Sequence, residues 1–383
     1  MFKITFIMLL NISEGRGTER FTYYLIKNKP DDFVINVFQP ENYTVKRLTD
    51  DELKIINENA NIINYSYKDK SKNKFRNRIL ISILDIYHNL YDNKYGKIMN
   101  TIKMNSPNNF KEIIESNFIY LYLNKFAKTF KNFNITIIGT NHTFKPNEYC
   151  GFNGLKKYIV QLADNNFLKY INAFHYFKSS ERYLKCLNVE KNLLCNLGVE
   201  TSLFYPKEHK NNKIKFFFVA SLIYNKGLDI LLPVIDYFKE NNDIEFHIAG
   251  SGSLEGEITK RNYIKFYKNP DNNKLSELYR ECDVFIYPTH QDMLPAVILQ
   301  AVSSGLYVLC SDYLKGNFDD FEGKYLKYIT NHKEYYIDEI KNIIENRNLI
   351  NHDKNEEYTY VKQNYDWEKI SDNFYSSLRN IKT

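Results

Sequence analysis

The sequence predicts an α/β protein made of two doubly wound domains with parallel sheets. The chain has 383 residues, more than one ordinary hydrophobic core organises. Near-continuous apolar runs, such as residues 3–10 and 214–221, are typical of parallel strands covered on both faces. In both halves of the chain these runs alternate with stretches of helical spacing, which is the pattern of β–α–β units.

The first half begins with a strand, a turn, a helix and a second strand. Residues 3–10 form the first expected strand, and the turn after it contains Gly17. Thr18 is a candidate N-cap for a helix that starts near Glu19, and residues 31–40 form the next strand. This order is the start of a doubly wound sheet.

The second half repeats the alternation with stronger signals. Residues 214–221 and 243–250 are expected strands, each followed by a loop and a helix, and a third such strand covers 263–268. Residues 287–312 then predict a strand end, a loop, a short helix and another strand. A polar, charged stretch after Pro206 is the expected linker between the halves.

Composition excludes several classes of protein. The five cysteines are scattered and form no C-x-x-C pair, so the sequence indicates neither a zinc site nor a disulfide framework, and a reducing cytoplasm is the simplest location. The apolar residues 1–12 are short and lead into a polar turn, so we interpret them as a buried strand and not as a signal peptide. No run approaches the roughly 20 apolar residues that span a bilayer.

Two polar side chains in residues 287–312 carry the functional argument. Asp292 and Gln300 lie eight residues apart and bracket the start of the expected helix. At that spacing a carboxylate and an amide can face one pocket, which suits a polyhydroxylated ligand at the carboxyl ends of parallel strands. The bland interpretations are that Asp292 caps the helix and that Gln300 is a buried, satisfied amide.

This segment resembles the donor-site signature of retaining GT-B glycosyltransferases of the large family four, the glycosyl transferases group 1. That signature has two glutamates separated by seven residues, followed by small residues and a glycine. Pro295, Ala301 and Gly305 fall in register with it, while Asp292 and Gln300 stand at the two glutamate positions. In relatives the first glutamate lies near the donor sugar and the second binds the ribose hydroxyls.

Other segments resemble the same family in its usual order. Lys226 matches a lysine that grips the nucleotide diphosphate in relatives, and Ser221 stands where an arginine is usual. Taken alone, Lys226 would be interpreted as a solvated loop lysine. Gly250 and Gly252 resemble the Gly-x-Gly turn that lets backbone amides approach the nucleotide, although a plain β–α turn would look the same.

The resemblance implies further donor-binding residues. Lys268 and Asn269 lie at the turn that holds the base through backbone groups, so the base itself cannot be read from the sequence. The backbone amides of Met293 and Leu294 are expected to face the sugar or phosphate.

Two residues of the first half complete the expected site. Gly17 belongs to the turn that matches the family's glycine-rich turn. His142 matches a histidine found near the donor sugar, and its place at the carboxyl end of a strand makes a catalytic and a structural role equally favoured.

The fold implied is GT-B, with two Rossmann-like domains facing a central cleft. We expect an acceptor-side domain over residues 1–205, a nucleotide-sugar donor domain over 206–365, and a C-terminal helix over 366–383 that crosses back to the first domain.

The reaction implied is transfer of a sugar from a nucleotide sugar to an acceptor hydroxyl with retention. Lys226 and backbone amides would stabilise the leaving diphosphate, which would itself take the acceptor's proton. The sequence has no D-x-D motif, so we expect no required metal, and no cofactor beyond the nucleotide-sugar donor. One alternative is a degenerate GT-B protein that binds a nucleotide sugar, a glycan or a partner without turnover. Another is a sugar-nucleotide epimerase or a phosphorylase on the same scaffold.

The acceptor class is left open among glycans, lipid-linked saccharides and proteins. Six basic residues lie between Lys68 and Arg78, interleaved with apolar ones, so residues 68–80 predict either a solvated basic segment or contact with an anionic membrane surface. A peripheral membrane location follows from the second interpretation. Nucleic acid is not expected as a partner, because no recognition module accompanies the charge.

Overall fold

The computed structural model divides the chain into two compact units. One is Met1–Cys195 with Ser371–Thr383, and the other is Asn196–Ile370. Sequence reasoning put the divisions after residues 205 and 365, and its three-part division stays a prediction. The residues that the structure describes are 2–8, 11–15, 17–41, 46–65, 111–117, 136–140, 173–176, 192–194, 196–208, 212–292 and 294–380.

The first unit contains a parallel sheet of seven described strands in the order β3-β2-β1-β4-β5-β6-β7. The order runs from β1 to β2 and β3 on one side and from β1 to β4 and the later strands on the other, as in a doubly wound sheet. The strands are β1 (Phe2–Ile7), β2 (Phe33–Pro40), β3 (Ala60–Tyr65), β4 (Lys111–Asn117), β5 (Thr136–Thr140), β6 (Ala173–Tyr176) and β7 (Asn192–Leu194).

The starts of two helices in this unit can be compared with the sequence. Besides the 3₁₀ turn η1 (Ile12–Glu14), the described helices are α1 (Gly17–Lys27) and α2 (Asp50–Asn59). Thr49 and Glu52 form a capping box that satisfies backbone N–H groups at the start of α2. Helix α1 already begins at Gly17, so the expectation that Thr18 is its N-cap is wrong.

The last helix, α14 (Trp367–Arg379), contributes residues to both units. Its second half packs in the first unit, where the Tyr375 hydroxyl donates to the Leu25 carbonyl at 2.6 Å. Phe374 meets Phe21 edge to face, and Arg379 forms a two-pronged ion pair with Asp32. These contacts bury one stripe of the helix, in keeping with its amphipathic sequence.

The second unit contains a six-stranded parallel sheet in the order β10-β9-β8-β11-β12-β13. The strands are β8 (Ile214–Ser221), β9 (Ile244–Ser251), β10 (Ile264–Lys268), β11 (Val284–Tyr287), β12 (Tyr307–Ser311) and β13 (Leu326–Ile329). The helices are η4 (Tyr224–Lys226), α8 (Leu228–Tyr237), α9 (Glu255–Thr259), α10 (Asn272–Glu281), α11 (Ala296–Ser303), η5 (Asp312–Leu314), η6 (Asp319–Phe321), α12 (Lys333–Glu345), η7 (Arg347–Ile350) and α13 (Lys354–Tyr365).

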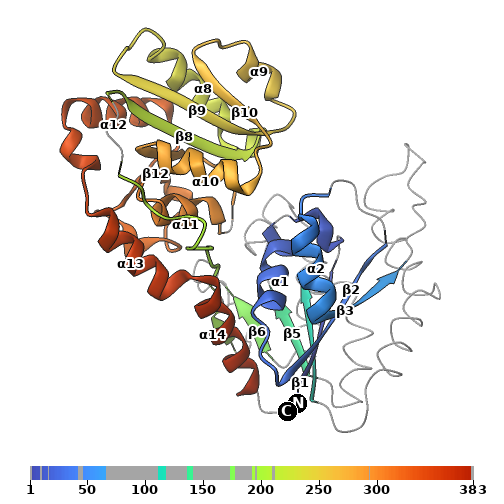
Figure 1. The fold of residues 1–383 in the computed structure, drawn as a ribbon. Helices are drawn as coiled ribbons and strands as arrows, with labels where there is room; N and C mark the ends of the chain where they lie inside the picture. The colour runs from blue at the N-terminus through green and yellow to red at the C-terminus, as the bar shows by residue number, and fades with distance from the viewer. Residues whose placement is uncertain are drawn as a thin grey trace, which may run out of the picture. The chain divides into compact units, whose positions relative to one another are not determined.

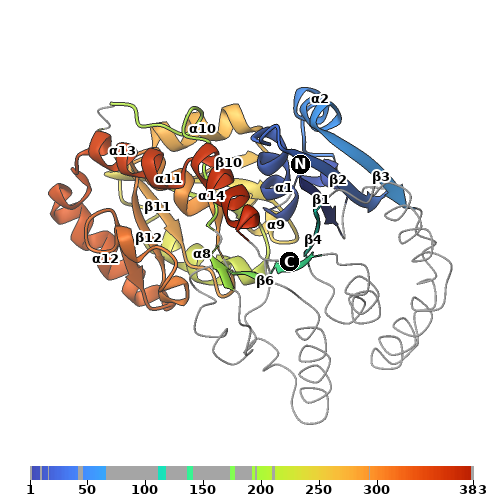
Figure 2. The same ribbon diagram turned by 90° about the horizontal axis from the view of Figure 1, so that it is seen from below.

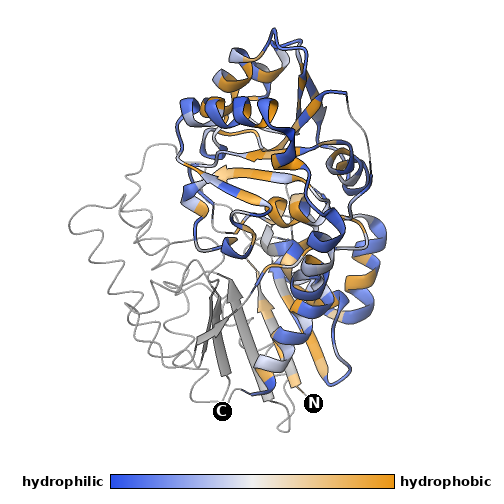
Figure 3. Cartoon of the chain, turned by 90° about the vertical axis from the view of Figure 1, so that its left-hand side faces the viewer, coloured by the Kyte–Doolittle hydropathy of each residue, from blue (hydrophilic) through white to orange (hydrophobic). Residues whose placement is uncertain are grey.

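Helices cover both faces of this second sheet. Figure 1 shows α8 and α9 on one face and α10 and α11 on the other. Helix α12 packs on α8, and α13 packs on α11, so each face gains a further helix (Figures 1 and 2). Colouring by hydropathy places the apolar residues mainly on the strands and on one side of the helices (Figure 3). The strands and helices expected after residue 214 are confirmed in order and type.

No helix among the described residues is both long and apolar enough to cross a membrane. The described core is instead that of packed sheets, and its largest fully buried side chains include Phe216, Phe217 and Tyr279.

One buried pair of titratable groups lies between α13 and the strands. Glu357 has no exposed surface, and its Oε2 lies 2.6 Å from Nε2 of His352. Burial raises the pKa of Glu357 well above its ordinary value and lowers the pKa of His352 to about 4, because burial disfavours the charged form of each. Burial therefore favours the neutral form of each side chain in the folded protein.

Replacing Glu357 by Gln is expected to reduce the loss of stability as pH rises. The raised pKa means that the folded protein keeps a proton that the unfolded chain releases above its ordinary pKa of 4.5, so higher pH favours unfolding. The neutral amide does not titrate. Scanning calorimetry should show that the melting temperature of Glu357→Gln, measured relative to that of the wild type at the same pH, rises between pH 5 and pH 8.

The matched control is Glu356→Gln, which alters an exposed neighbour on the same helix. It should keep the pH dependence of the wild type. An equal fall in melting temperature for Glu357→Gln and the wild type would contradict a protonated Glu357.

Candidate functional site

The middle of the second sheet is where its winding reverses. Strand β8 is central, β9 follows it on one side, and β11 lies on its other side. The ladder between β8 and β11 is short and pairs only Val284 with Phe216 and Phe285 with Phe217. Beyond these pairs the two strands continue without further pairing toward their carboxyl ends. Ligands of doubly wound sheets bind at such a reversal.

The loop after β8 brings Lys226 to this point. Residues 224–226 form one 3₁₀ turn that Gly227 ends in the left-handed conformation, with φ of 79°. A Cβ atom on Gly227 would lie 1.9 Å from the Pro288 carbonyl oxygen, so only glycine allows the loops after β8 and β11 to approach this closely.

The loop after β11 brings Asp292 to the same point. The Lys226 ammonium donates to Asp292 Oδ2, and the Tyr287 hydroxyl donates to the same oxygen at 2.8 Å. Both members of the ion pair keep about a fifth of their side chain exposed, 21% for Lys226 and 19% for Asp292. Lys226 is therefore not a solvated loop lysine, and the structure joins two of the residues selected from sequence.

Tyr287 is buried and contacts this ion pair. Burial, and then the charge of Asp292, raise the pKa of Tyr287 well above its ordinary value, so its hydroxyl is a fixed donor. The Lys226 ammonium also lies 6.0 Å from the centre of the Tyr287 ring. Sequence reasoning did not select Tyr287, although it ends the strand that leads to Asp292.

Gln300 lies on α11, the helix that follows the Asp292 loop in the sequence. Its Oε1 accepts a hydrogen bond from the Tyr279 hydroxyl at 3.2 Å. This hydrogen bond agrees with the interpretation of Gln300 as a satisfied amide. The side chain is only partly buried, so part of it remains accessible to a ligand. Helix α11 begins after Pro295, so the alternative in which Asp292 caps that helix is wrong.

Two helices begin at the ends of the loops after β8 and β11, with no side-chain cap from the described residues. They are α8, whose N-cap is Gly227, and α11, whose N-cap is Pro295. Uncapped N–H groups and the helix dipole favour an anion. Both helices directly follow the strands that flank the reversal.

The Gly-x-Gly turn after β9 is required by close backbone packing. A Cβ on Gly250 would lie 2.0 Å from the Ala220 carbonyl oxygen, and one on Gly252 would lie 2.4 Å from that of Leu222. The turn thus fits against the end of β8, one strand away from Lys226. The glycines are explained by this contact whether or not a nucleotide binds there.

The remaining donor-site candidates lie on the same carboxyl edge. Ser221 is exposed at the end of β8. Lys268 ends β10 and pairs with Glu255 at 2.7 Å. Asn269 adopts a left-handed conformation with φ of 44°, and its N–H donates to the Gly250 carbonyl.

Other predicted site residues are placed less fully. Leu294 is half-buried just before α11. Gly17 begins α1 in the first unit, and a Cβ added to it would have no atom within 4 Å. His142 and Met293 lie outside the described residues, as does the basic segment 68–80. Their assignments stay predictions.

The turn before Gly17 is held by a ladder of amide side chains. Asn11 Nδ2 donates to the Pro40 carbonyl at 2.8 Å, and Gln39 Oε1 accepts from the Ile12 N–H at 2.8 Å. Gln39 in turn donates to Asn64 at 3.1 Å. These contacts join the turn after β1 to the carboxyl ends of β2 and β3, and the other neighbour of β1 in the sheet is β4, where the strand order reverses.

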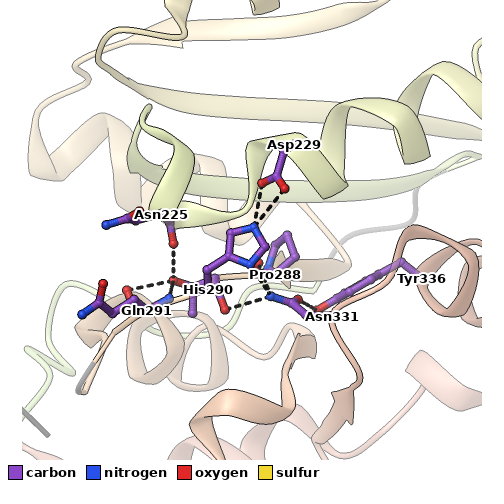
Figure 4. Close-up of polar contacts among 8 residues, drawn as sticks. Asn225, Asp229, Pro288, His290, Gln291, Asn331 and Tyr336 are labelled. Carbon is purple, nitrogen blue, oxygen red and sulfur yellow. Dashed lines mark hydrogen bonds and ion pairs between the residues drawn. The ribbon is translucent and has the colours of Figure 1, made fainter. Parts of the chain in front are cut away.

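A histidine network that sequence reasoning missed lies beside the ion pair. His290 Nε2 lies 2.8 and 3.0 Å from the two carboxylate oxygens of Asp229, and Asn331 Nδ2 lies 3.3 Å from His290 Nδ1 (Figure 4). The Tyr224 ring stacks on the imidazole at 5.2 Å. The signal was present, because His290 follows the carboxyl end of a strand two residues before Asp292.

No group of three His, Cys, Asp or Glu side chains that could hold a metal ion occurs in the part of the chain that the structure describes. The chemistry of the described site is that of one lysine, one carboxylate, buried tyrosines and backbone N–H groups. Such a set suits binding of an anionic, polyhydroxylated ligand.

Comparison with known proteins decides the family of the second unit. Residues 200–364 match the family model described as "Glycosyl transferases group 1". The match covers nearly all of the second unit, and residues 200–364 are called the group 1 domain. The group 1 domain contains Lys226, Asp292 and Gln300, whose roles remain predictions.

Curated relatives match over short segments. An uncharacterized glycosyltransferase of Methanocaldococcus jannaschii is 27% identical over 101 residues, 24% of this chain and 26% of that protein. TuaC of Bacillus subtilis, a putative teichuronic acid biosynthesis glycosyltransferase, is 21% identical over 127 residues, 30% of this chain and 32% of that protein. The matched segments span about a quarter to a third of each relative.

Solved structures match over the whole chain. Sucrose-phosphate synthase of Thermosynechococcus elongatus gives a TM-score of 0.75 at 14% identity, over 99% of this chain and 98% of that one. Anabaena HepE, solved in complex with UDP and glucose, gives 0.72 at 13% identity, over 99% and 100%. The fold is therefore GT-B, as expected from the sequence.

Replacing Gly227 by Ala is expected to destabilise the group 1 domain by about 2–4 kcal/mol. The methyl group meets the Pro288 carbonyl oxygen, and the left-handed backbone adds strain. Urea unfolding measures the change. The control, Gly256→Ala, adds a methyl group to α9 where no atom lies within 4 Å, and should stabilise by about 0.5–1 kcal/mol. Equal stability of the two variants would contradict the close approach of the loops.

Proposed function

We propose that this protein is a glycosyltransferase that moves a sugar from a nucleotide-sugar donor to an acceptor hydroxyl with retention. The observation that carries the proposal is the position of Lys226 and Asp292 where the second sheet reverses. A cation, a carboxylate and two helix N-termini converge there, within a domain of the glycosyl transferases group 1. That combination suits the diphosphate and the sugar of such a donor.

Lys226 is the proposed electrostatic catalyst. Breaking the bond between the sugar and the diphosphate leaves negative charge on the phosphate oxygens, and the Lys226 ammonium and the N–H groups at the starts of α8 and α11 would stabilise it. The ammonium is already held by Asp292, so it is preorganised but must exchange or share that partner when a phosphate arrives.

The remaining roles follow from the same arrangement. Asp292 would accept hydrogen bonds from the donor sugar, and Gln300 would bind the ribose hydroxyls through its partly buried amide. The acceptor would attack from the side of the leaving group, and the leaving phosphate would take its proton. His142 is the proposed further contact to the donor sugar, and no step in this scheme uses a metal ion.

For the donor and the acceptor we propose only the chemical class. HepE was solved with UDP and glucose, and a TarM variant was solved with UDP and an α-GlcNAc-glycerol, so UDP-sugars are the first donors to test. We propose a glycan or lipid-linked acceptor. Cytoplasmic location, and contact of residues 68–80 with an anionic membrane, are proposals from the sequence alone.

Replacing Lys226 by Met is expected to weaken binding of nucleoside diphosphates by about tenfold or more and to lower kcat by about 100-fold. The variant keeps most of the side-chain volume but loses the charge that meets the leaving phosphate. Calorimetric titration with UDP, GDP, ADP and their hexose conjugates measures binding, and release of nucleotide in the presence of acceptor measures turnover.

The control is Lys260→Met, which removes an exposed lysine on the same domain. Its binding and turnover should match the wild type. Unchanged turnover in a folded Lys226→Met protein would overturn the assignment, and a wild type that binds no donor would favour the degenerate, non-catalytic alternative.

Replacing Gln300 by Glu tests whether the substituted signature limits donor binding. A carboxylate can still accept the Tyr279 hydrogen bond, and it binds a ribose diol more strongly because its hydrogen bonds are charge-assisted. We expect the dissociation constant of the donor to fall about fivefold in calorimetry. Gln363→Glu, an exposed change on α13, should leave it unaltered. An unchanged or higher constant for Gln300→Glu would argue against contact between residue 300 and the ribose.

A further inference from the structure

The loop that carries Asp292 is attached to the loop that carries Lys226 by more than their ion pair. The Asn225 carbonyl oxygen accepts from the Thr289 hydroxyl at 3.0 Å, from the His290 N–H at 3.0 Å and from the Gln291 N–H at 3.4 Å. This oxygen belongs to the residue directly before Lys226. One carbonyl therefore fixes three successive residues of the other loop (Figure 4).

The contacts around His290 define which of its nitrogens carries the proton. Asn331 Nδ2 lies 3.0 and 3.1 Å from the carbonyl oxygens of Pro288 and Thr289, which can only accept, so this atom is the amide nitrogen. The same nitrogen lies 3.3 Å from His290 Nδ1, and Nε2 on the other side of the ring faces carboxylate oxygens, which accept. The proton of the neutral ring lies on Nε2 and is donated to Asp229.

The imidazole therefore joins three segments that are far apart in sequence. Asp229 lies in the first turn of α8, His290 lies in the loop after β11, and Asn331 lies between β13 and α12. Tyr336 on α12 extends the network by donating to Asn331 Oδ1 at 3.4 Å. The ring is two residues from Asp292, and Asp229 is three residues from Lys226.

We propose that His290, held by Asp229 and Asn331, is a positioning residue that sets the Lys226–Asp292 ion pair for the donor phosphate. The role in donor binding rests on the function proposed above, whereas the effect on the ion pair does not. A purely structural role would lower the stability of the domain without changing the environment of Lys226. The two roles therefore differ in a measurable way.

The reactivity of Lys226 toward an amine-acylating reagent reports whether its ammonium is paired with Asp292, and the measurement needs no ligand. Trace acetylation, resolved by peptide mass spectrometry, gives the rate at each lysine, and exposed Lys260 serves as the internal reference. Asp292→Asn removes the partner carboxylate and should raise the Lys226 rate at least about fivefold. Asp229→Ala should raise it by a similar factor if the network positions the pair.

Helix α8 offers a matched control and a rescue. Asp236 lies in its last turn and pairs with Arg261, so Asp236→Ala removes a carboxylate from the same helix and should leave the Lys226 rate unchanged. Asp229→Asn keeps an oxygen that accepts from His290 Nε2 and should restore most of the protection. His290→Gln provides a second break of the network, should Asp229→Ala fail to fold by circular dichroism.

The outcomes separate the inference from the proposed function. Increased Lys226 acetylation in Asp229→Ala or His290→Gln, but not in Asp236→Ala, supports positioning even if the wild type binds no nucleotide. A wild-type rate in both broken variants overturns it, and so does an Asp292→Asn rate equal to that of the wild type. In a protein that binds UDP, Asp229→Ala should weaken binding about tenfold, but add no further loss to Lys226→Met.

Discussion

The close contact between the Gly227 backbone and the Pro288 carbonyl is the constraint on which the site depends. It lies just beyond the point where β8 and β11 stop pairing, and it brings the two following loops together where the ladder no longer does. Lys226 comes one residue before this contact and Asp292 four residues after it. With any side chain at position 227 the two loops would have to separate, and the ion pair would lose its fixed geometry.

The charge arrangement follows from this contact. Asp292 is one methylene shorter than the glutamate of the family signature, yet its Oδ2 meets both Lys226 and the buried hydroxyl of Tyr287. A buried neutral donor beneath a half-buried carboxylate stabilises its charge without competing for the cation. The substitution therefore keeps an ordered carboxylate at this position, and the ion pair orders Lys226 before a ligand arrives.

The sequence predicted the order and type of the elements in the second unit because its strands are long apolar runs separated by glycine, proline and charged residues. It also placed Lys226 and Asp292 at one edge. It did not predict that they touch, since their contact depends on a loop approach across 66 residues. The pairing of His290 with Asp229 is of the same kind, across 61 residues. The start of α1 was misplaced by a short distance, because the helix already begins at Gly17, before Thr18.

The absence of an arginine at position 221 has an electrostatic consequence for the proposed reaction. A diphosphate carries more negative charge than one lysine offsets, and Lys226 is already shared with Asp292. Within the second unit the remaining stabilisation falls to backbone N–H groups, and the described ones best placed to supply it are the first turns of α8 and α11, which no described side chain caps. Such donors are fixed by the fold and need no reorganisation, so their contribution depends on how rigidly the two loops are held. The glycine contact and the histidine network are therefore part of the electrostatics of the site as well as of its architecture.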